Sequence, residues 1–133
     1  MAPTGRNRDL VAGIYEAMAG ADLDEILKRC HADVTITQAE ELPWGGHFEG
    51  HDGLIEFVSK LITTIDSKVA QDVIFEAGEH VVQRGRTQGT VRATGAPFDV
   101  PEVHVWTIRD GKVAAAHFYI DTPLMLEALA EGG

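Results

Sequence analysis

A histidine close to a tryptophan is the residue of this sequence best suited to move a proton. Residues 98–109 alternate as in a β-strand, which places His104 and Trp106 on the same side. An imidazole titrates near neutral pH, and dehydrated aromatic surroundings shift its pKa. His104 is therefore a candidate general acid/base. A buried neutral histidine that makes a single hydrogen bond and has no catalytic role explains the same pattern, so both interpretations stay open.

Three residues between positions 47 and 51 have the types that bind metal ions. His47, Glu49 and His51 recur at every second position, which would place them on one side of a continued strand. Gly50 interrupts that strand, and His51 with Asp52 stands where a helix has to begin. We therefore predict no metal here. We also predict no cofactor, because the sequence has no phosphate-binding glycine loop, dinucleotide fingerprint or nucleophile elbow.

The composition disfavours several classes of partner. The 133 residues fit one domain, and 11 Lys and Arg against 21 Asp and Glu give a net charge of −10. Such a charge repels nucleic-acid phosphates and anionic membranes. The single cysteine, Cys30, excludes an internal disulfide and is expected to be a buried structural thiol on the apolar side of a helix. With no apolar leader or span of 18 apolar residues, the prediction is a soluble cytoplasmic protein.

Hydrophobic periodicity predicts helices first and strands afterwards. Residues 1–8 are expected to be disordered, and residues 9–130 to form one domain. Helices are expected from Asp9, from Asp22 with Glu25 as a capping partner, over 52–65, and from Thr122, where Asp121 would be a helix-start carboxylate. Strands are expected at 34–38, 47–49, 69–75, 81–94, 98–109 and 112–120. This order predicts an α+β fold with helices on one face of a curved antiparallel sheet.

The last two strands carry apolar residues on both faces. Strict alternation places Ala114, Ala116, Phe118 and Ile120 on the face toward the helices. The opposite face then carries Val103, Val105, Val113, Ala115 and Tyr119. An apolar outer face needs a cover, and a second copy of the chain provides one. The pattern predicts a symmetric homodimer formed through this face.

The order of elements resembles the cone-shaped α+β fold of the nuclear transport factor 2 (NTF2) superfamily over almost the whole chain. Several stretches are similar to its SnoaL-like branch, which includes polyketide cyclases and ketosteroid-isomerase-related proteins. These are GADLD at 20–24, ADV at 32–34, LPWGG at 42–46 with Gly50 and Phe57, and HVWTIRDGKV at 104–113. The resemblance implies a curved antiparallel sheet wrapped around the N-terminal helices, as in cystatin-like and NTF2-like folds.

Residue by residue, the resemblance matches the family's proton-transfer groups in part. Tyr15 corresponds to the oxyanion-donor tyrosine of ketosteroid isomerases, and Gln38 stands where these enzymes have a carboxylate base. His104 falls at the second oxyanion donor and is similar to a histidine of SnoaL-type cyclases. The acid/base aspartate of those cyclases falls near Phe118. The resemblance thus implies that both carboxylates of the family are replaced here.

Together, these observations predict a cofactor-free acid/base isomerase or cyclase acting on a small apolar compound with a carbonyl or hydroxyl group. His104 would exchange the proton, while Tyr15 and Gln38 hold the substrate oxygen. The apolar ligand-binding pocket would be lined by Trp44, Phe57, Leu61, Trp106, Phe118 and Ile120. One alternative is a non-catalytic dimer that binds a small molecule. Another is a structural dimerisation domain whose pocket is filled by its own side chains.

Overall fold

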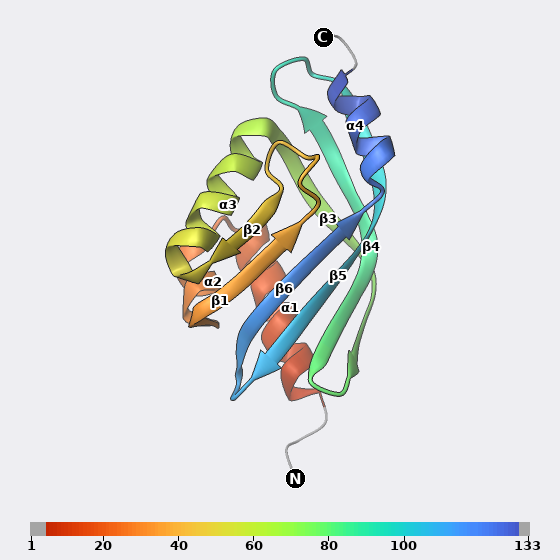
Figure 1. The fold of residues 1–133 in the computed structure, drawn as a ribbon. Helices are drawn as coiled ribbons and strands as arrows, with labels where there is room; N and C mark the ends of the chain where they lie inside the picture. The colour runs from red at the N-terminus through yellow and green to blue at the C-terminus, as the bar shows by residue number, and fades with distance from the viewer. Residues whose placement is uncertain (1–4, 131–133) are drawn as a thin grey trace.

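The computed structural model describes residues 5–130, and in this range the chain folds into four helices and six strands (Figure 1). In chain order these are α1 (Arg6–Ala19), α2 (Leu23–Lys28), β1 (Cys30–Gln38), β2 (Gly46–Glu49), α3 (Gly50–Thr64), β3 (Ile65–Ala77), β4 (His80–Val91), β5 (Pro97–Arg109), β6 (Lys112–Ile120) and α4 (Thr122–Ala130). The predicted α+β class with helices first is confirmed.

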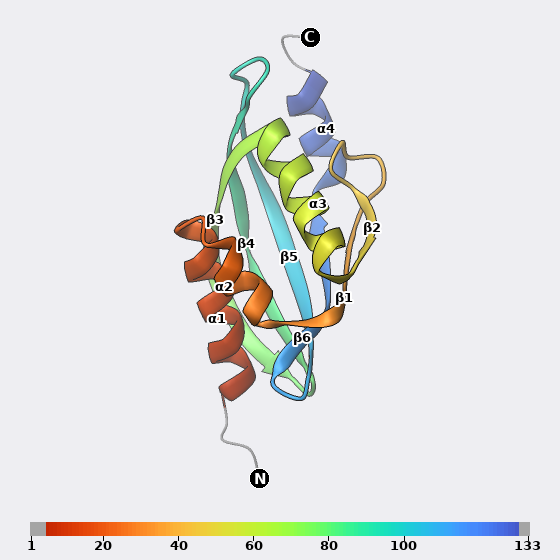
Figure 2. The ribbon, with the colours of Figure 1, turned by 90° about the vertical axis from the view of Figure 1, so that its left-hand side faces the viewer.

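All six strands belong to one curved sheet with the order β2-β1-β6-β5-β4-β3. Hairpins join β3 through β6 in antiparallel succession, as predicted, whereas β1 pairs with β6 in parallel. The helices α1, α2 and α3 lie on one side of the sheet, with α1 and α2 at the left of the view and α3 in front in Figure 2. We call the side that faces α1 and α3 the interior, because the buried side chains gather there.

The first helix starts earlier than predicted. Gly5, with a φ of 90°, precedes it, and the backbone N–H of Asp9 donates to the carbonyl of Gly5. Asp9 is therefore a residue of the first turn rather than the N-cap. Residues 6–8 are helical where disorder was predicted, and residues 1–4 lie outside the described residues. A glycine is suited to this start because a positive φ costs it no steric energy.

The second helix is shorter than predicted. Its N-cap is confirmed, because the Asp22 side chain accepts a hydrogen bond from the Glu25 backbone N–H at 3.2 Å. The helix ends at Lys28, and Cys30 begins β1 opposite Val113 of β6. The prediction that Cys30 is helical was wrong because strand pairing wins over local periodicity at this point. Its burial is confirmed, and burial raises the pKa of the thiol to about 11.

An extra residue in β6 changes which side chains face the interior. Thr107 pairs with Ala115, but Ile108 pairs with Val113, so Ala114 is a β-bulge. Val113 consequently turns inward and is fully buried. Its predicted place on the outer face is wrong, because the bulge reverses the alternation between Val113 and Ala115.

The core fills the space between the helices and the sheet. Its fully or almost fully buried members include Val11, Ile14, Val34, Ile36, Val81, Val100, Val113 and Met125. The closing helix α4 starts as predicted, with the Asp121 carboxylate accepting the backbone N–H of Leu124 at 3.1 Å. Among residues 5–130, no helix has the length and apolar character needed to cross a membrane.

Candidate functional site

The interior face of β5 carries the polar side chains of the site. Glu102, His104 and Trp106 alternate with outward residues and are buried, as the sequence pattern predicts. Helix α1 adds Tyr15, which is buried because its helix packs against β3 and β4. The site therefore lies between α1 and the interior face of β5.

Three of these side chains form a hydrogen-bonded chain. The Trp106 Nε1–H donates to Tyr15 Oη at 3.0 Å, and Tyr15 Oη lies 2.7 Å from His104 Nδ1. The Tyr15 and His104 rings are stacked with an interplanar angle of 6°. The structure thus brings together His104, the predicted proton-exchanging group, and Tyr15, one of the two groups predicted to hold the substrate oxygen.

Burial keeps both groups neutral at ordinary pH. Desolvation lowers the pKa of His104 to about 3 and raises the pKa of the Tyr15 hydroxyl far above its ordinary value. A neutral imidazole can accept a hydrogen bond, and a neutral phenol can donate one. These are the states needed for a site that exchanges a proton with an oxygen atom.

Glu102 is a buried carboxylate that the family comparison did not identify. Its side chain is fully buried, and its Oε2 lies 3.3 Å from His104 Nε2. Neither of its oxygens has a hydrogen-bond partner, and the nearby Gln83 Oε1 has none either. Burial raises the pKa of Glu102 to about 7, although the neighbouring Gln83 amide favours the ionised form and opposes part of this shift. The alternation of β5 signalled its inward position, whereas nothing in the sequence marked Gln83.

Gln38 belongs to a separate polar pair. Its Oε1 accepts the Trp44 Nε1–H at 2.8 Å, and both side chains are buried. In the sheet, Gln38 pairs with Phe118, which in turn pairs with His104. Gln38 is thus two strands away from His104, about 10 Å at the usual strand spacing. The structure does not join it to the Tyr15–His104 chain.

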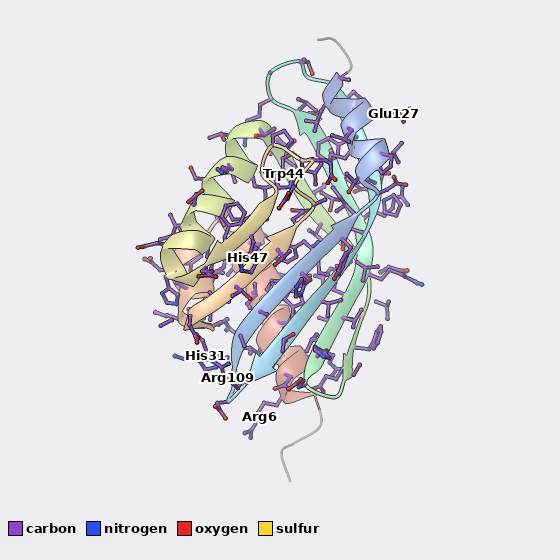
Figure 3. The ribbon with its side chains drawn as sticks, viewed as in Figure 1. Arg6, His31, Trp44, His47, Arg109 and Glu127 are labelled. Carbon is purple, nitrogen blue, oxygen red and sulfur yellow. The ribbon has the colours of Figure 1, made fainter. Side chains whose placement is uncertain are left out.

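Trp44 is positioned by the tight loop between β1 and β2 (Figure 3). A Cβ atom at the next residue, Gly45, would stand 1.7 Å from the carbonyl oxygen of Ala39. Only glycine therefore permits this close crossing of the loop over itself. The Leu-Pro-Trp-Gly-Gly sequence thus forms a tight loop that buries the Trp44 indole at one end of the interior.

Aromatic side chains surround the His104 imidazole. Its ring centroid lies 4.7 Å from that of Phe118, which is itself 5.3 Å from Trp106 and 5.5 Å from Phe57. Leu61 and Ile120 are partly buried against the same cluster. Of the side chains predicted to line the pocket, Phe57, Trp106 and Phe118 are therefore neighbours in one aromatic cluster.

Two hollows of the surface lie apart from this cluster. One, of about 730 Å³, is lined by strands β3 to β6 and includes Tyr119, Arg84 and the edge of Glu102. The other, of about 470 Å³, lies between β2 and the start of α3. Neither is lined by Tyr15 or His104.

The candidate metal-binding segment is divided between two elements. His47 and Glu49 lie on β2 with 3.4 Å between Nε2 and Oε1, whereas His51 belongs to α3 and contacts the carbonyl of Cys30 at 3.2 Å. Within residues 5–130, no three His, Cys, Asp or Glu side chains are grouped as metal ligands. The break at Gly50, with a φ of 74°, separates them as the sequence pattern indicated.

Comparison with known proteins identifies the class. The family model for the SnoaL-like domain matches residues 11–116, so the chain belongs to the SnoaL-like family. Its fold is that of the NTF2-like proteins, which confirms the resemblance found in the sequence. No curated protein matches the sequence.

Solved structures of similar proteins cover nearly the whole chain. An NTF2-like protein of unknown function from Burkholderia pseudomallei K96243 is 28% identical with a TM-score of 0.88, over 98% of this chain and 99% of that one. TerC, co-crystallised with polyporic acid, is 28% identical with a TM-score of 0.84, over 93% and 98%. A putative SnoaL-like polyketide cyclase from Jannaschia sp. CCS1 shares the fold at 19% identity, with a TM-score of 0.87 over 100% and 98%.

Proposed function

We propose that this protein is a cofactor-free acid/base enzyme that isomerises or cyclises a small, largely apolar carbonyl compound. The observation that carries the proposal is the buried Trp106–Tyr15–His104 hydrogen-bond chain inside an aromatic cluster. Membership of the SnoaL-like family and the co-crystallisation of the similar protein TerC with polyporic acid support a small-molecule ligand.

The chemistry follows from the protonation states of these groups. When hydroxide from the solvent takes the α-proton of the substrate and becomes water, an enolate forms. A neutral Tyr15 hydroxyl can stabilise the negative charge on its oxygen by donating a hydrogen bond to it. His104 Nδ1 exchanges a proton with that hydroxyl, so the pair can give a proton to the substrate oxygen or remove one. The aromatic cluster excludes water, which strengthens both interactions.

Gln38 has a different role from that of Tyr15 in this proposal. Its amide Oε1 is occupied by Trp44, which leaves the Nε2–H groups as donors. A substrate that extends from Tyr15 past Phe118 reaches these donors with a second oxygen. This arrangement suits a compound with two separated oxygen functions.

Deuterium exchange tests the reaction class without the natural substrate. An enzyme that catalyses enolisation speeds the exchange of the α-protons of an apolar ketone such as 1-tetralone in D₂O, followed by proton NMR. We expect His104→Gln to lower the protein-catalysed rate about 100-fold to 10,000-fold. His47→Gln, a change of the same type at an exposed histidine, should leave it unchanged.

The alternative function is ligand binding without chemistry. In that case 1-tetralone and related cyclic ketones shift the NMR signals of the interior residues, but the exchange rate stays at the value of the buffer. If no ketone of the series binds, the interior ligand site itself is contradicted.

We also propose a homodimer formed through the outer face of the sheet. Val73, Phe75 and Tyr119 are 38%, 45% and 56% exposed, and the strand registers place them on the same outer face as Val103 and Val105. Burial of this apolar patch by a second copy would stabilise both chains. The corrected position of Val113 removes one member from the predicted patch but leaves its centre intact.

A further inference from the structure

Four polar side chains cross the interior in a row that the proposed reaction uses only in part. Tyr15 of α1 contacts His104 of β5, whose other ring nitrogen faces Glu102, and Gln83 of β4 pairs with His104 across the sheet. The row ends in three buried acceptor oxygens without a donor, two on Glu102 and one on Gln83. Buried acceptors are nearly always hydrogen-bonded, so the row has room for one more proton.

When Glu102 is ionised, one arrangement of hydrogen atoms fits the contacts of the row. Tyr15 Oη already accepts from Trp106, and among residues 5–130 His104 Nδ1 is the acceptor in contact with it. The Tyr15 hydroxyl therefore donates to Nδ1, which puts the imidazole hydrogen on Nε2, facing the Glu102 carboxylate. Trp106 thus donates to Tyr15 and Tyr15 to His104, while the Nε2–H faces Glu102 Oε2 at 3.3 Å without completing a hydrogen bond in this structure, and one lone pair of Tyr15 Oη remains free.

A protonated Glu102 reverses this direction. Its carboxyl proton then points to His104 Nε2, the imidazole hydrogen moves to Nδ1 and donates to Tyr15 Oη, and the Tyr15 hydroxyl is free to donate outward. In both arrangements the two ring nitrogens of His104 and the indole of Trp106 face a matching group, and one hydrogen-bonding position of Tyr15 Oη stays open to a ligand. They differ by one proton on Glu102.

We propose that Glu102 stores the proton that the site exchanges with its ligand, while His104 relays it as a neutral imidazole. The inference rests on the proposed function and deepens it, because it defines the ligand group. That group is an oxygen that alternates between acceptor and donor, as in a carbonyl and its enol. Glu102 is a positioning residue in this scheme, since Tyr15 is the group that contacts the ligand.

The proton path is balanced at every bond. An enol O–H gives its proton to Tyr15 Oη, the Tyr15 hydroxyl proton passes to His104 Nδ1, and the Nε2 proton of His104 passes to Glu102. The ligand is left as an enolate, whose carbon attacks a carbonyl carbon and leaves an alkoxide on the oxygen of that carbonyl group. The reverse sequence returns one proton to an oxygen of the product, and no oxidant, metal or cofactor takes part.

The surroundings of Glu102 favour storage of a proton over a fixed charge. Its neighbours across the sheet are Gly85 of β4 and Ile120 of β6, neither of which is charged. His104 on its own strand and Tyr15 from α1 are the titratable groups that face it. The charged residues of the outer hollow are exposed, and they comprise Arg84 paired with Asp72, Arg86 paired with Asp99, and Asp121 at the start of α4.

NMR titration of the wild-type protein tests the proposal without a substrate. We would follow the ¹³C signals of Glu side-chain carboxyls and the ¹⁵N signals of the imidazoles between pH 5 and 9. The expected result is a Glu102 carboxyl that titrates near neutral pH. The His104 tautomer should change with the same midpoint. At pH values above the midpoint the imidazole hydrogen should be on Nε2, and at pH values below it on Nδ1, and no imidazolium should form.

Two variants make the assignment specific. Glu102→Gln should fix the His104 tautomer over the whole range, whereas Glu127→Gln, at an exposed position on α4 labelled in Figure 3, should leave the titration unchanged. His104→Gln should leave a Glu102 signal that still titrates above the ordinary range, which keeps the test valid if Glu102→Gln does not fold.

The proposal is overturned if Glu102 titrates in the ordinary carboxylate range, or if His104 becomes an imidazolium between pH 5 and 9. It is equally overturned if the tautomer does not follow the Glu102 titration. Failure of the ketone-exchange assay with an intact titration would instead refute the proposed function alone.

Discussion

The stability of this protein should depend on pH through the buried Glu102, and replacing that residue by glutamine should remove the dependence. The substitution keeps the shape of the side chain and takes away the charge. In the folded protein the pKa of Glu102 is about 7, whereas an unfolded chain has the ordinary value of about 4.3.

The sign of the effect follows from proton uptake. Between about pH 4 and pH 7 the folded state binds more protons than the unfolded state, so the free energy of unfolding falls as the pH rises. At 1.36 kcal/mol for each pH unit, the loss above pH 7 reaches about 3 to 4 kcal/mol. Glu102→Gln does not lose this amount. Relative to that of wild type, the free energy of unfolding of Glu102→Gln should rise by about 3 kcal/mol between pH 4.5 and pH 8.5.

Urea denaturation at fixed protein concentration measures this difference directly. The contribution of His104, whose folded pKa is lowered, is lost as the pH falls below about 6.5 in both proteins and cancels in the comparison. Parallel stability curves for wild type and Glu102→Gln would refute the reasoning, because they would mean that the carboxyl does not resist ionisation. Glu127→Gln is the exposed control and should run parallel to wild type.

Three further outcomes are expected. Tyr15→Phe leaves the Trp106 Nε1–H and His104 Nδ1 unpaired in the core, so the free energy of unfolding should fall by about 1 to 3 kcal/mol in thermal or urea unfolding. Ketone exchange should be lost as well. An unchanged stability would contradict the buried hydrogen-bond chain. Tyr119→Asp should convert a dimer to a monomer of 14.4 kDa in light scattering at micromolar concentration, and a wild-type monomer would refute the outer-face dimer. Elemental analysis of untagged protein should find no stoichiometric metal, and one zinc or iron per chain would overturn this expectation.

The positions of Tyr15 and His104 could be predicted from two different patterns. The alternation of β5 is regular through Trp106, so the inward direction of His104 followed from sequence spacing alone. The family resemblance then supplied Tyr15, which no local pattern could have connected with a residue 89 positions away. Contacts of this kind depend on how a helix crosses a sheet, and a single sequence does not encode that crossing in any short motif.

The errors of prediction have equally specific causes. Val113 was misplaced because a single inserted residue, Ala114, reverses strict alternation without changing the composition of the strand. Cys30 was assigned to a helix because its periodicity is helical, but its pairing partner lies on β6. Gln38 was predicted to hold the same substrate oxygen as Tyr15, although its bond to Trp44 and the intervening strand β6 separate it from the Tyr15–His104 pair.

Glu102 shows a different limit of sequence analysis. Its inward direction was visible in the alternation, but its lack of partners depends on what neighbouring strands bring to it. Gly85 and Ile120 supply no donor there, and Gln83 is turned so that its amide nitrogen donates to the Arg84 carbonyl. The unpartnered state of the Glu102 carboxylate therefore follows only from the three-dimensional packing.

A crystal structure with an enolisable apolar ketone such as 1-tetralone tests the central claim most directly, because the claim places the reacting oxygen within hydrogen-bond distance of one atom, Tyr15 Oη. We predict that the ketone oxygen lies about 3 Å from Tyr15 Oη, with the rings of Trp106 and Phe118 against its apolar body. Binding of the ketone only in the outer hollow beside Tyr119 and Arg84, with the Tyr15–His104 pair untouched, would contradict the account.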